Sequence, residues 1–128
     1  MTAPTAAGLV SAAKARIVNL SPSDVSRELA SGDAVLIDIR EPEERVAFGT
    51  IPGAIHAPRG MIEFYADATS PYHRPEFVTD RRIILYCASG GRSALATDVL
   101  QQLGYARPAH LDGGLKAWVA ADMPIETA

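Results

Sequence analysis

The residues best suited to chemistry in this chain form one short run, YCASGGRS at positions 86–93. The run contains Cys87, which is the only cysteine among the 128 residues. A cysteine thiolate is a strong nucleophile, and successive glycines leave backbone N–H groups free to surround an anion. The residue types and their spacing therefore predict covalent sulfur chemistry at Cys87.

The segments on either side of this run predict that Cys87 lies on a turn between a strand and a helix. Residues 81–86 read RRIILY, which is typical of a short buried strand. Residues 93–103 place four apolar side chains on one face of a helix that Gly104 ends. Unpaired backbone N–H groups and the positive end of the helix dipole meet at such a turn. Both favour an anion, so we expect them to stabilise the thiolate of Cys87 and to make it the catalytic nucleophile.

The rest of the loop is predicted to bind substrate. Its two glycines can expose backbone N–H groups towards the sulfur, and its first serine can add a hydroxyl donor. Arg92 carries a planar fork of donors that matches an oxyanion, so it could bind an anionic substrate or lower the pKa of the cysteine. The alternative is that Arg92 anchors the loop to a carboxylate. We assign substrate binding to Ala88, Ser89, Gly90, Gly91 and Arg92.

Other polar residues receive structural interpretations. Ser93 is predicted to be the N-cap of the helix that follows the loop, and so to support the site. Glu43 and Glu44 are expected on the solvated face of a short helix that Pro42 begins. His110 is expected to satisfy a backbone group at the end of a strand.

Strands alternate with helices along the whole chain, which predicts an α/β domain with a largely parallel sheet. The apolar runs at 35–37 and 83–85 fit strands that are covered on both faces. In such sheets, ligands bind outside the carboxyl ends of the strands, which is where Cys87 falls. Asp38 and Arg40, which follow the earlier strand, are expected near the same edge.

Composition excludes several classes of function. The formal net charge is −3 and no basic stripe is visible, so no nucleic-acid partner is expected. One cysteine excludes an intrachain disulfide and a cysteine-cluster metal site, and the three histidines lack metal-ligand spacing. We therefore expect no metal and no cofactor. The apolar run near the N-terminus is too weak for a membrane span or a secretory signal, which makes a reducing cytoplasmic setting the default.

Four segments, in this order and at these intervals, carry a resemblance to a known family. They are LIDIREPEE at 36–44, GTIPGAI at 49–55, YCASGGRS at 86–93 and LDGGLKAW at 111–118. The chain resembles a single-domain rhodanese, a thiosulfate sulfurtransferase-like module, from roughly Ile17 to Ile125. Two features depart from the family's pattern: Thr50 stands where many relatives have histidine, and a long segment covers residues 59–82.

The resemblance implies a three-layer fold with a largely parallel five-stranded sheet flanked by helices. It implies a rhodanese-like domain at residues 16–126, and the small apolar residues before it are expected to form a flexible tail at residues 1–15 or an extra first turn of helix. It also implies that Asp38 and Arg40 are structural, tying together the face that carries the active site.

The activity that the resemblance implies is transfer of a sulfane sulfur through a persulfide on Cys87. The donor would be thiosulfate or a persulfide, and the acceptor a thiol, or cyanide in an assay. One alternative is a non-catalytic carrier that presents the persulfide to a protein partner. A phosphatase or an arsenate reductase is a weaker alternative, because those enzymes use a Cys-x5-Arg loop around a tetrahedral oxyanion, whereas this loop is Cys-x4-Arg. The sequence leaves the oligomeric state open.

Overall fold

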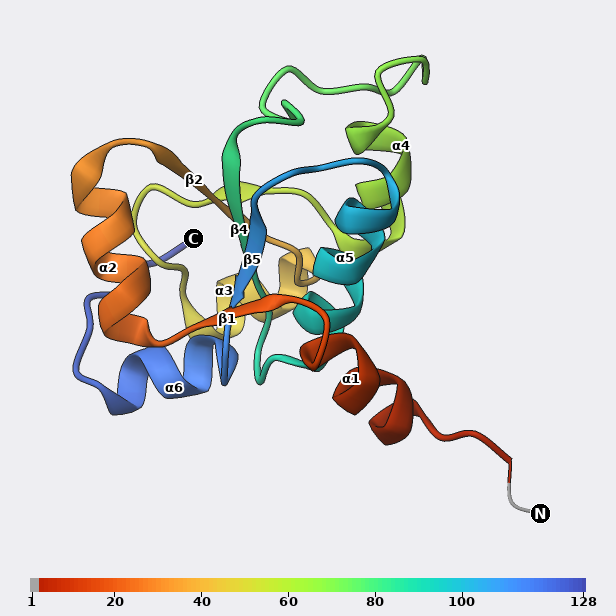
Figure 1. The fold of residues 1–128 in the computed structure, drawn as a ribbon. Coiled ribbons are helices and arrows are strands. Elements are labelled where there is room, and N and C mark those ends of the chain that lie inside the picture. The colour runs from red at the N-terminus through yellow and green to blue at the C-terminus, as the bar shows by residue number, and fades with distance from the viewer. Residues whose placement is uncertain (1–2) are drawn as a thin grey trace.

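A central sheet of five parallel strands organises the chain in the computed structural model, which describes residues 3–128 (Figure 1). Each neighbouring pair of strands in the order β1-β5-β4-β2-β3 is parallel. The predicted α/β class and the five-stranded parallel sheet are therefore confirmed. The strands are β1 (Val18–Leu20), β2 (Ala34–Asp38), β3 (Ile55–His56), β4 (Arg82–Tyr86) and β5 (Pro108–Leu111).

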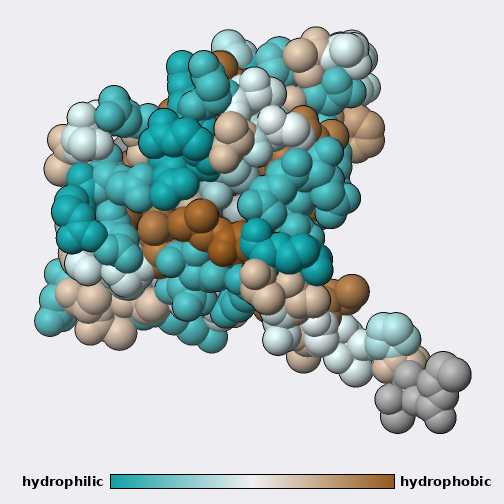
Figure 2. All heavy atoms as spheres, viewed as in Figure 1, coloured by the Kyte–Doolittle hydropathy of each residue, from teal (hydrophilic) through white to brown (hydrophobic). Residues whose placement is uncertain are grey.

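Helices cover both faces of this sheet and make three layers. Helices α2 and α6 lie on one face, and α1, α4 and α5 lie on the other, as Figure 1 shows. In the same view, hydrophilic side chains cover most of α2 and α5, and hydrophobic atoms reach the surface in one area between them (Figure 2). The helices described are α1 (Ala6–Lys14), α2 (Pro22–Ser31), α3 (Pro42–Phe48), α4 (Ile62–Ala66), α5 (Gly91–Gln102) and α6 (Gly114–Ala120), with a 3-10 turn η1 (Arg59–Met61) before α4.

The two-residue period of β4 explains why the sheet is buried on both sides. Ile83 and Leu85 pack into the core beneath α4 and α5, whereas Ile84 and Tyr86 pack into the core beneath α2 and α6. All four side chains are fully buried. The continuous apolar run thus fills two cores at once, as expected for a central parallel strand.

Capping residues explain where helix α2 begins and ends. Ser21 is its N-cap and forms a capping box with Asp24, and Pro22 is its first residue. Gly32 ends the helix in a left-handed conformation with φ of 84°.

Two other segments take a form that the sequence did not specify. Residues 6–14, within the segment predicted to be a tail or an extra turn of helix, form α1, which packs against α5 and buries Ala13 completely. Residues 1 and 2 of that segment lie outside the described residues. The long segment after β3 forms η1, α4 and a series of turns, and Phe77 anchors it in the core.

The parallel register brings the loops after β2, β4 and β5 to one edge of the sheet. Asp38 pairs with Tyr86 across β2 and β4, and Leu85 pairs with His110 across β4 and β5. Cys87 follows Tyr86 directly, so it lies at the carboxyl edge beside the residues that follow β2 and β5. None of the helices in residues 3–128 combines the length and the hydrophobicity that a membrane crossing requires.

Candidate active site

Cys87 lies between the end of β4 and the first turn of α5. Its side chain is only 1% exposed and packs on the α5 side of the sheet, against the core there. The backbone N–H of Gly90 donates a hydrogen bond to Cys87 Sγ with an N–S distance of 3.2 Å. Gly91 then begins α5, so the sulfur sits at the N-terminus of a twelve-residue helix, as the sequence predicted.

Gly90 gives the loop the curvature that turns its N–H group towards the sulfur. Its φ is 103°, a left-handed conformation that strains any residue with a Cβ. A Cβ at this position would also lie 3.1 Å from the backbone nitrogen of Gly113. The close approach of the two loops therefore requires glycine here.

The surroundings of Cys87 lower its pKa below the ordinary value for cysteine. Burial alone raises the pKa, because it disfavours the charged thiolate. Hydrogen bonds that the thiolate can accept from the Ser93 hydroxyl and from the backbone amides of Ser93, Gly90 and Ser89 outweigh that effect. These amides face the sulfur, as the sequence predicted, and a lowered pKa makes the thiolate more abundant at neutral pH.

Ser93 supports the site by a different contact from the one predicted. The prediction that it is the N-cap of the helix is wrong, because Gly90 holds that position and α5 begins two residues before Ser93. The left-handed conformation of Gly90 allows this early start. Ser93 lies instead in the first turn of α5, where its Oγ is 3.5 Å from Cys87 Sγ.

His110 and Asn19 complete a chain of hydrogen bonds that reaches Cys87 through Ser93. His110 is fully buried, with Nδ1 2.8 Å from Ser93 Oγ and Nε2 2.7 Å from Asn19 Oδ1. The amide nitrogen of Asn19 donates to the carbonyl of Lys14, so Asn19 Oδ1 is an acceptor and Nε2 of His110 bears a proton. Burial lowers the pKa of His110 to about 4, which keeps the ring neutral. Nδ1 is then an acceptor, and the Ser93 hydroxyl donates to it.

This arrangement makes Cys87 and His110 compete for one proton. Ser93 has a single hydroxyl hydrogen, and in the resting site it points to His110 Nδ1 at 2.8 Å rather than to the more distant carbonyl of Gly90 at 3.3 Å. The protonated thiol of Cys87 therefore donates to Ser93 Oγ. When Cys87 ionises, the hydroxyl can stabilise the thiolate only by turning away from His110.

We predict that His110→Phe lowers the pKa of Cys87. The change removes the acceptor that holds the Ser93 hydroxyl, so the hydroxyl becomes available to the thiolate. A hydrogen bond of about 1 kcal/mol corresponds to a shift of about 0.7 pKa units. The rate of Cys87 alkylation by iodoacetamide should therefore reach its half-maximum at a lower pH than in the unmodified protein. A midpoint at higher pH would show that His110 assists ionisation instead.

Arg92 is bound to a carboxylate on helix α3. Its Nη1 and Nη2 donate to Oε1 and Oε2 of Glu44, both at 2.8 Å. This hydrogen-bonded pair lowers the pKa of Glu44 to about 2 and raises the pKa of Arg92. Glu44 is thus not simply a solvated residue of α3, as expected, but joins α3 to the active-site loop.

Asp38 and Arg40 form a buried ion pair that braces the edge of the sheet. Asp38 accepts from Arg40 Nε at 3.0 Å and Nη2 at 2.8 Å, from the Tyr86 hydroxyl at 3.0 Å and from Arg45 Nε at 3.1 Å. Arg40 Nη2 also donates to the carbonyl of Gly49 at 2.7 Å. Burial raises the pKa of Asp38, but its hydrogen bonds with Arg40 outweigh burial and lower it. These contacts tie the loop after β2 to β4, to the middle of α3 and to its C-cap.

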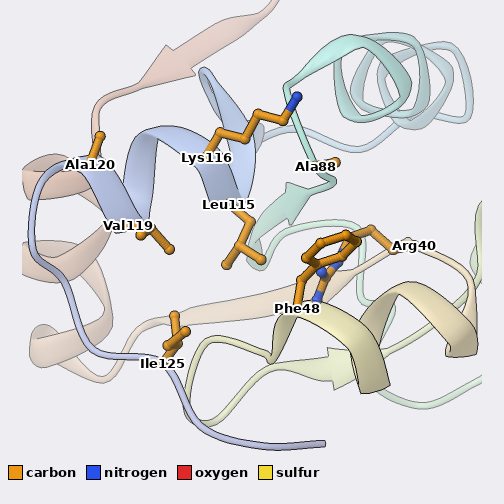
Figure 3. A pocket seen from close by; sticks show the side chains of 8 residues that line it. All are labelled: Arg40, Phe48, Ala88, Leu115, Lys116, Val119, Ala120 and Ile125. Atoms are coloured by element: carbon orange, nitrogen blue, oxygen red, sulfur yellow. The ribbon is translucent and has the colours of Figure 1, made fainter.

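The backbone of the active-site loop is also attached to α6. The N–H of Leu115 donates to the carbonyl of Cys87 at 2.9 Å, and the N–H of Lys116 donates to the carbonyl of Ala88 at 3.1 Å. Ala88 therefore contacts α6, and it lines a pocket between α3, α6 and the C-terminal segment (Figure 3). We name this the α3–α6 pocket; its volume is about 500 Å³ and it is lined by Arg40, Phe48, Ala88, Leu115, Lys116, Val119, Ala120 and Ile125.

Within residues 3–128, no group of three or more histidine, cysteine, aspartate or glutamate side chains is arranged to hold a metal ion. The predicted loop residues Cys87, Ser89, Gly90 and Ser93 are brought together around the sulfur. Arg92 lies beside them on Glu44. Sequence reasoning missed the part that Asn19, His110 and Glu44 play, because each meets the loop from a distant segment.

Comparisons with known proteins point to one family. The family described as "Rhodanese-like domain" matches residues 21–121. A sulfurtransferase from Allochromatium vinosum is 37% identical over 107 residues, which cover 83% of this chain and 92% of the relative. The human thiosulfate:glutathione sulfurtransferase is 33% identical over 98 residues, which cover 71% of this chain and 84% of the relative.

Two solved structures share the fold of this chain. A Rhodopseudomonas palustris protein, described as of unknown function and a possible tyrosine phosphatase, is 39% identical with a TM-score of 0.92, over 98% of this chain and 97% of that one. A human single-domain sulfurtransferase is 28% identical with a TM-score of 0.70, over 80% of this chain and 95% of that one.

Proposed function

Since this chain belongs to the rhodanese-like domain family, we propose that it is a sulfurtransferase that carries sulfur on Cys87. The Cys87 thiolate attacks the outer sulfur of thiosulfate or of a persulfide. The sulfur–sulfur bond of the donor breaks, and sulfite or a thiolate leaves with the electron pair. An acceptor thiolate, or cyanide in an assay, then attacks the terminal sulfur of the Cys87 persulfide and restores the thiolate. This is covalent catalysis in two half-reactions.

The observation that carries the proposal is the hydrogen bond from Gly90 N–H to Cys87 Sγ at the start of α5. The amides that favour a thiolate also suit a persulfide, because its terminal sulfur carries the same negative charge. No general base is needed beside Cys87, because the leaving sulfite or thiolate departs as an anion. The lowered pKa of Cys87 increases the fraction of thiolate, which is the nucleophile.

The relatives support the choice of donor and acceptor within this proposal. One is named a thiosulfate:glutathione sulfurtransferase, which makes thiosulfate a reasonable donor and a small thiol a reasonable acceptor for this chain. A reducing compartment such as the cytoplasm would keep Cys87 as a free thiol.

Intact-mass spectrometry tests the proposal directly. Incubation with thiosulfate should add one sulfur atom to the protein, and addition of cyanide should remove it with release of thiocyanate. Repeated turnover distinguishes an enzyme from a carrier that accepts sulfur once and releases it only to a protein partner. An unchanged mass with every sulfane donor, together with hydrolysis of a phosphate ester, would favour the phosphatase reading instead.

The ion pair between Arg92 and Glu44 should limit the affinity for thiosulfate. We predict that Glu44→Gln lowers KM for thiosulfate by about threefold to tenfold, because it releases a guanidinium beside the loop for the sulfonate. Arg92→Ala should raise KM for thiosulfate more than KM for an uncharged persulfide donor. Steady-state kinetics with both donors provide the measurement.

Glu43→Gln is the matched control, because it removes one negative charge from the neighbouring position of the same helix. It should leave KM for both donors nearly unchanged. If Arg92→Ala affects both donors equally, Arg92 only anchors the loop and does not bind the sulfonate.

A further inference from the structure

The α3–α6 pocket is lined by Arg40, whose guanidinium carries a buried donor group that the fold does not satisfy. Arg40 is fully buried, and its Nε and Nη2 are bound to Asp38 and Gly49, as described above. Its Nη1 is buried as well and has no hydrogen-bond partner among the described residues. A buried donor left unpaired costs on the order of 1–3 kcal/mol, and more for a charged group. A ligand that supplied an acceptor at this point would recover that energy.

We propose that this pocket binds a small amphiphilic anion whose acidic head accepts a hydrogen bond from Arg40 Nη1 and whose apolar body fills the space in front of it. Arg40 lines the pocket, and Figure 3 shows its side chain extending towards the group formed by Phe48 and Leu115. Nη1 lies on the opposite edge of the guanidinium from the Nε–Nη2 edge that Asp38 occupies. It is therefore the nitrogen left for a ligand.

The walls of the pocket fit an apolar body. Phe48 of α3, Leu115 and Val119 of α6, and Ile125 of the C-terminal segment surround the space in Figure 3. Phe48 and Val119 are 67% and 48% exposed, so large apolar side chains meet water at the rim. A volume of about 500 Å³ is within the range of small-molecule sites, which are mainly apolar with a few placed polar groups.

The charges around the pocket favour an anion. Arg40 and Arg45 share the single carboxylate of Asp38, which leaves one positive charge in excess. Lys116 also lines the pocket, but Figure 3 shows its ammonium group pointing away from the enclosed space, so Arg40 is the cation that faces a ligand; the lining residues that the structure describes include no carboxylate. A fatty or aromatic carboxylate combines the required charge with the required apolar surface.

The pocket is distinct from the sulfur site, and the proposal does not depend on sulfur transfer. Ala88 contributes to its wall, whereas Cys87 Sγ faces the core beneath α5. Binding should therefore persist in Cys87→Ser, even though that variant cannot carry sulfur. The two proposals can fail separately.

Isothermal titration with three probes tests the ligand class. Octanoate has both the apolar chain and the carboxylate of the proposed ligand, octanol has the apolar chain alone, and acetate has the carboxylate alone. We expect octanoate to bind the unmodified protein and Cys87→Ser equally, at least about tenfold more tightly than octanol, with no measurable acetate binding. Equal affinity for octanoate and octanol would overturn the role of Arg40, and absence of octanoate binding would overturn the proposal.

Substitutions at the rim of the pocket test where octanoate binds, and they leave the buried ion pair between Asp38 and Arg40 in place. Val119→Glu should weaken octanoate at least about fivefold more than Val119→Gln, since the two side chains have nearly the same size and differ in charge. Phe48→Ser should also weaken octanoate, whereas Phe64→Ser, at a similarly exposed position on α4, should not. Equal effects of the two Val119 variants, or of the two phenylalanine variants, would show that octanoate binds elsewhere. Thermal unfolding of each variant verifies that it remains folded.

Discussion

Cys87→Ser is expected to lower the rate of sulfur transfer from thiosulfate to cyanide by roughly a thousandfold or more, as loss of a covalent nucleophile does elsewhere. A serine hydroxyl is not ionised at neutral pH, and oxygen cannot form the persulfide that links the two half-reactions. The measurement is the rate of thiocyanate formation, followed by the intact mass after incubation with thiosulfate. No sulfur atom should be gained.

The same variant should remain folded, which makes its loss of activity interpretable. Serine is close to cysteine in size, and at position 87 its hydroxyl would find a donor in Gly90 N–H and a partner in Ser93. The cost in the free energy of unfolding should be about 1 kcal/mol. If Cys87→Ser still gains a sulfur atom, a residue other than Cys87 carries the sulfur, and the mechanism is contradicted.

The sequence predicted the architecture well because the apolar pattern is strong where the sheet is central. β4 is buried on both faces, and its unbroken apolar run could be placed in a parallel sheet without coordinates. The position of Cys87 followed from that strand and from the helix after it. Both elements are local, so their boundaries depend on neighbouring residues such as the glycines of the loop.

The contacts that tune the site could not be predicted in this way, because they join distant segments. His110 and Asn19 are 91 residues apart in the chain, and Arg92 and Glu44 are 48 apart. Each side chain alone has an ordinary local explanation, such as a solvated glutamate or a histidine at the end of a strand. Only the parallel register of β1, β5 and β4 brings the first pair to the sulfur.

The error at Ser93 has a more specific cause. A serine after a glycine-rich loop is a usual N-cap, but here Gly90 is the N-cap in a left-handed conformation, so the helix begins earlier, at Gly91. The side chain of Ser93 is thereby directed to the sulfur instead of to a backbone amide. One backbone dihedral angle thus changes the role of a residue from helix capping to thiol positioning.

The position of the active-site loop depends on contact with Gly114, and Gly114→Ala should disrupt it strongly. Gly114 begins α6 with φ of 60°, and a Cβ there would lie 2.6 Å from the backbone carbon of Ala88 and 2.6 Å from the carbonyl oxygen of Cys87. These are backbone atoms, so the loop or the helix must move. We expect the free energy of unfolding to fall by about 2–5 kcal/mol from conformational strain and overpacking together.

The rate of sulfur transfer by Gly114→Ala should fall together with its free energy of unfolding, because the displaced loop no longer directs the Gly90 amide at Cys87. Gly104→Ala separates strain from contact: its φ is 87°, yet nothing lies within 4 Å of the added Cβ. It should cost only about 1–2 kcal/mol and leave the rate of the folded protein unchanged. Urea unfolding and thiocyanate formation in both variants supply the comparison. Equal losses of stability and activity would mean that backbone strain alone governs these positions, and that close packing of α6 on the loop does not hold the sulfur site in place.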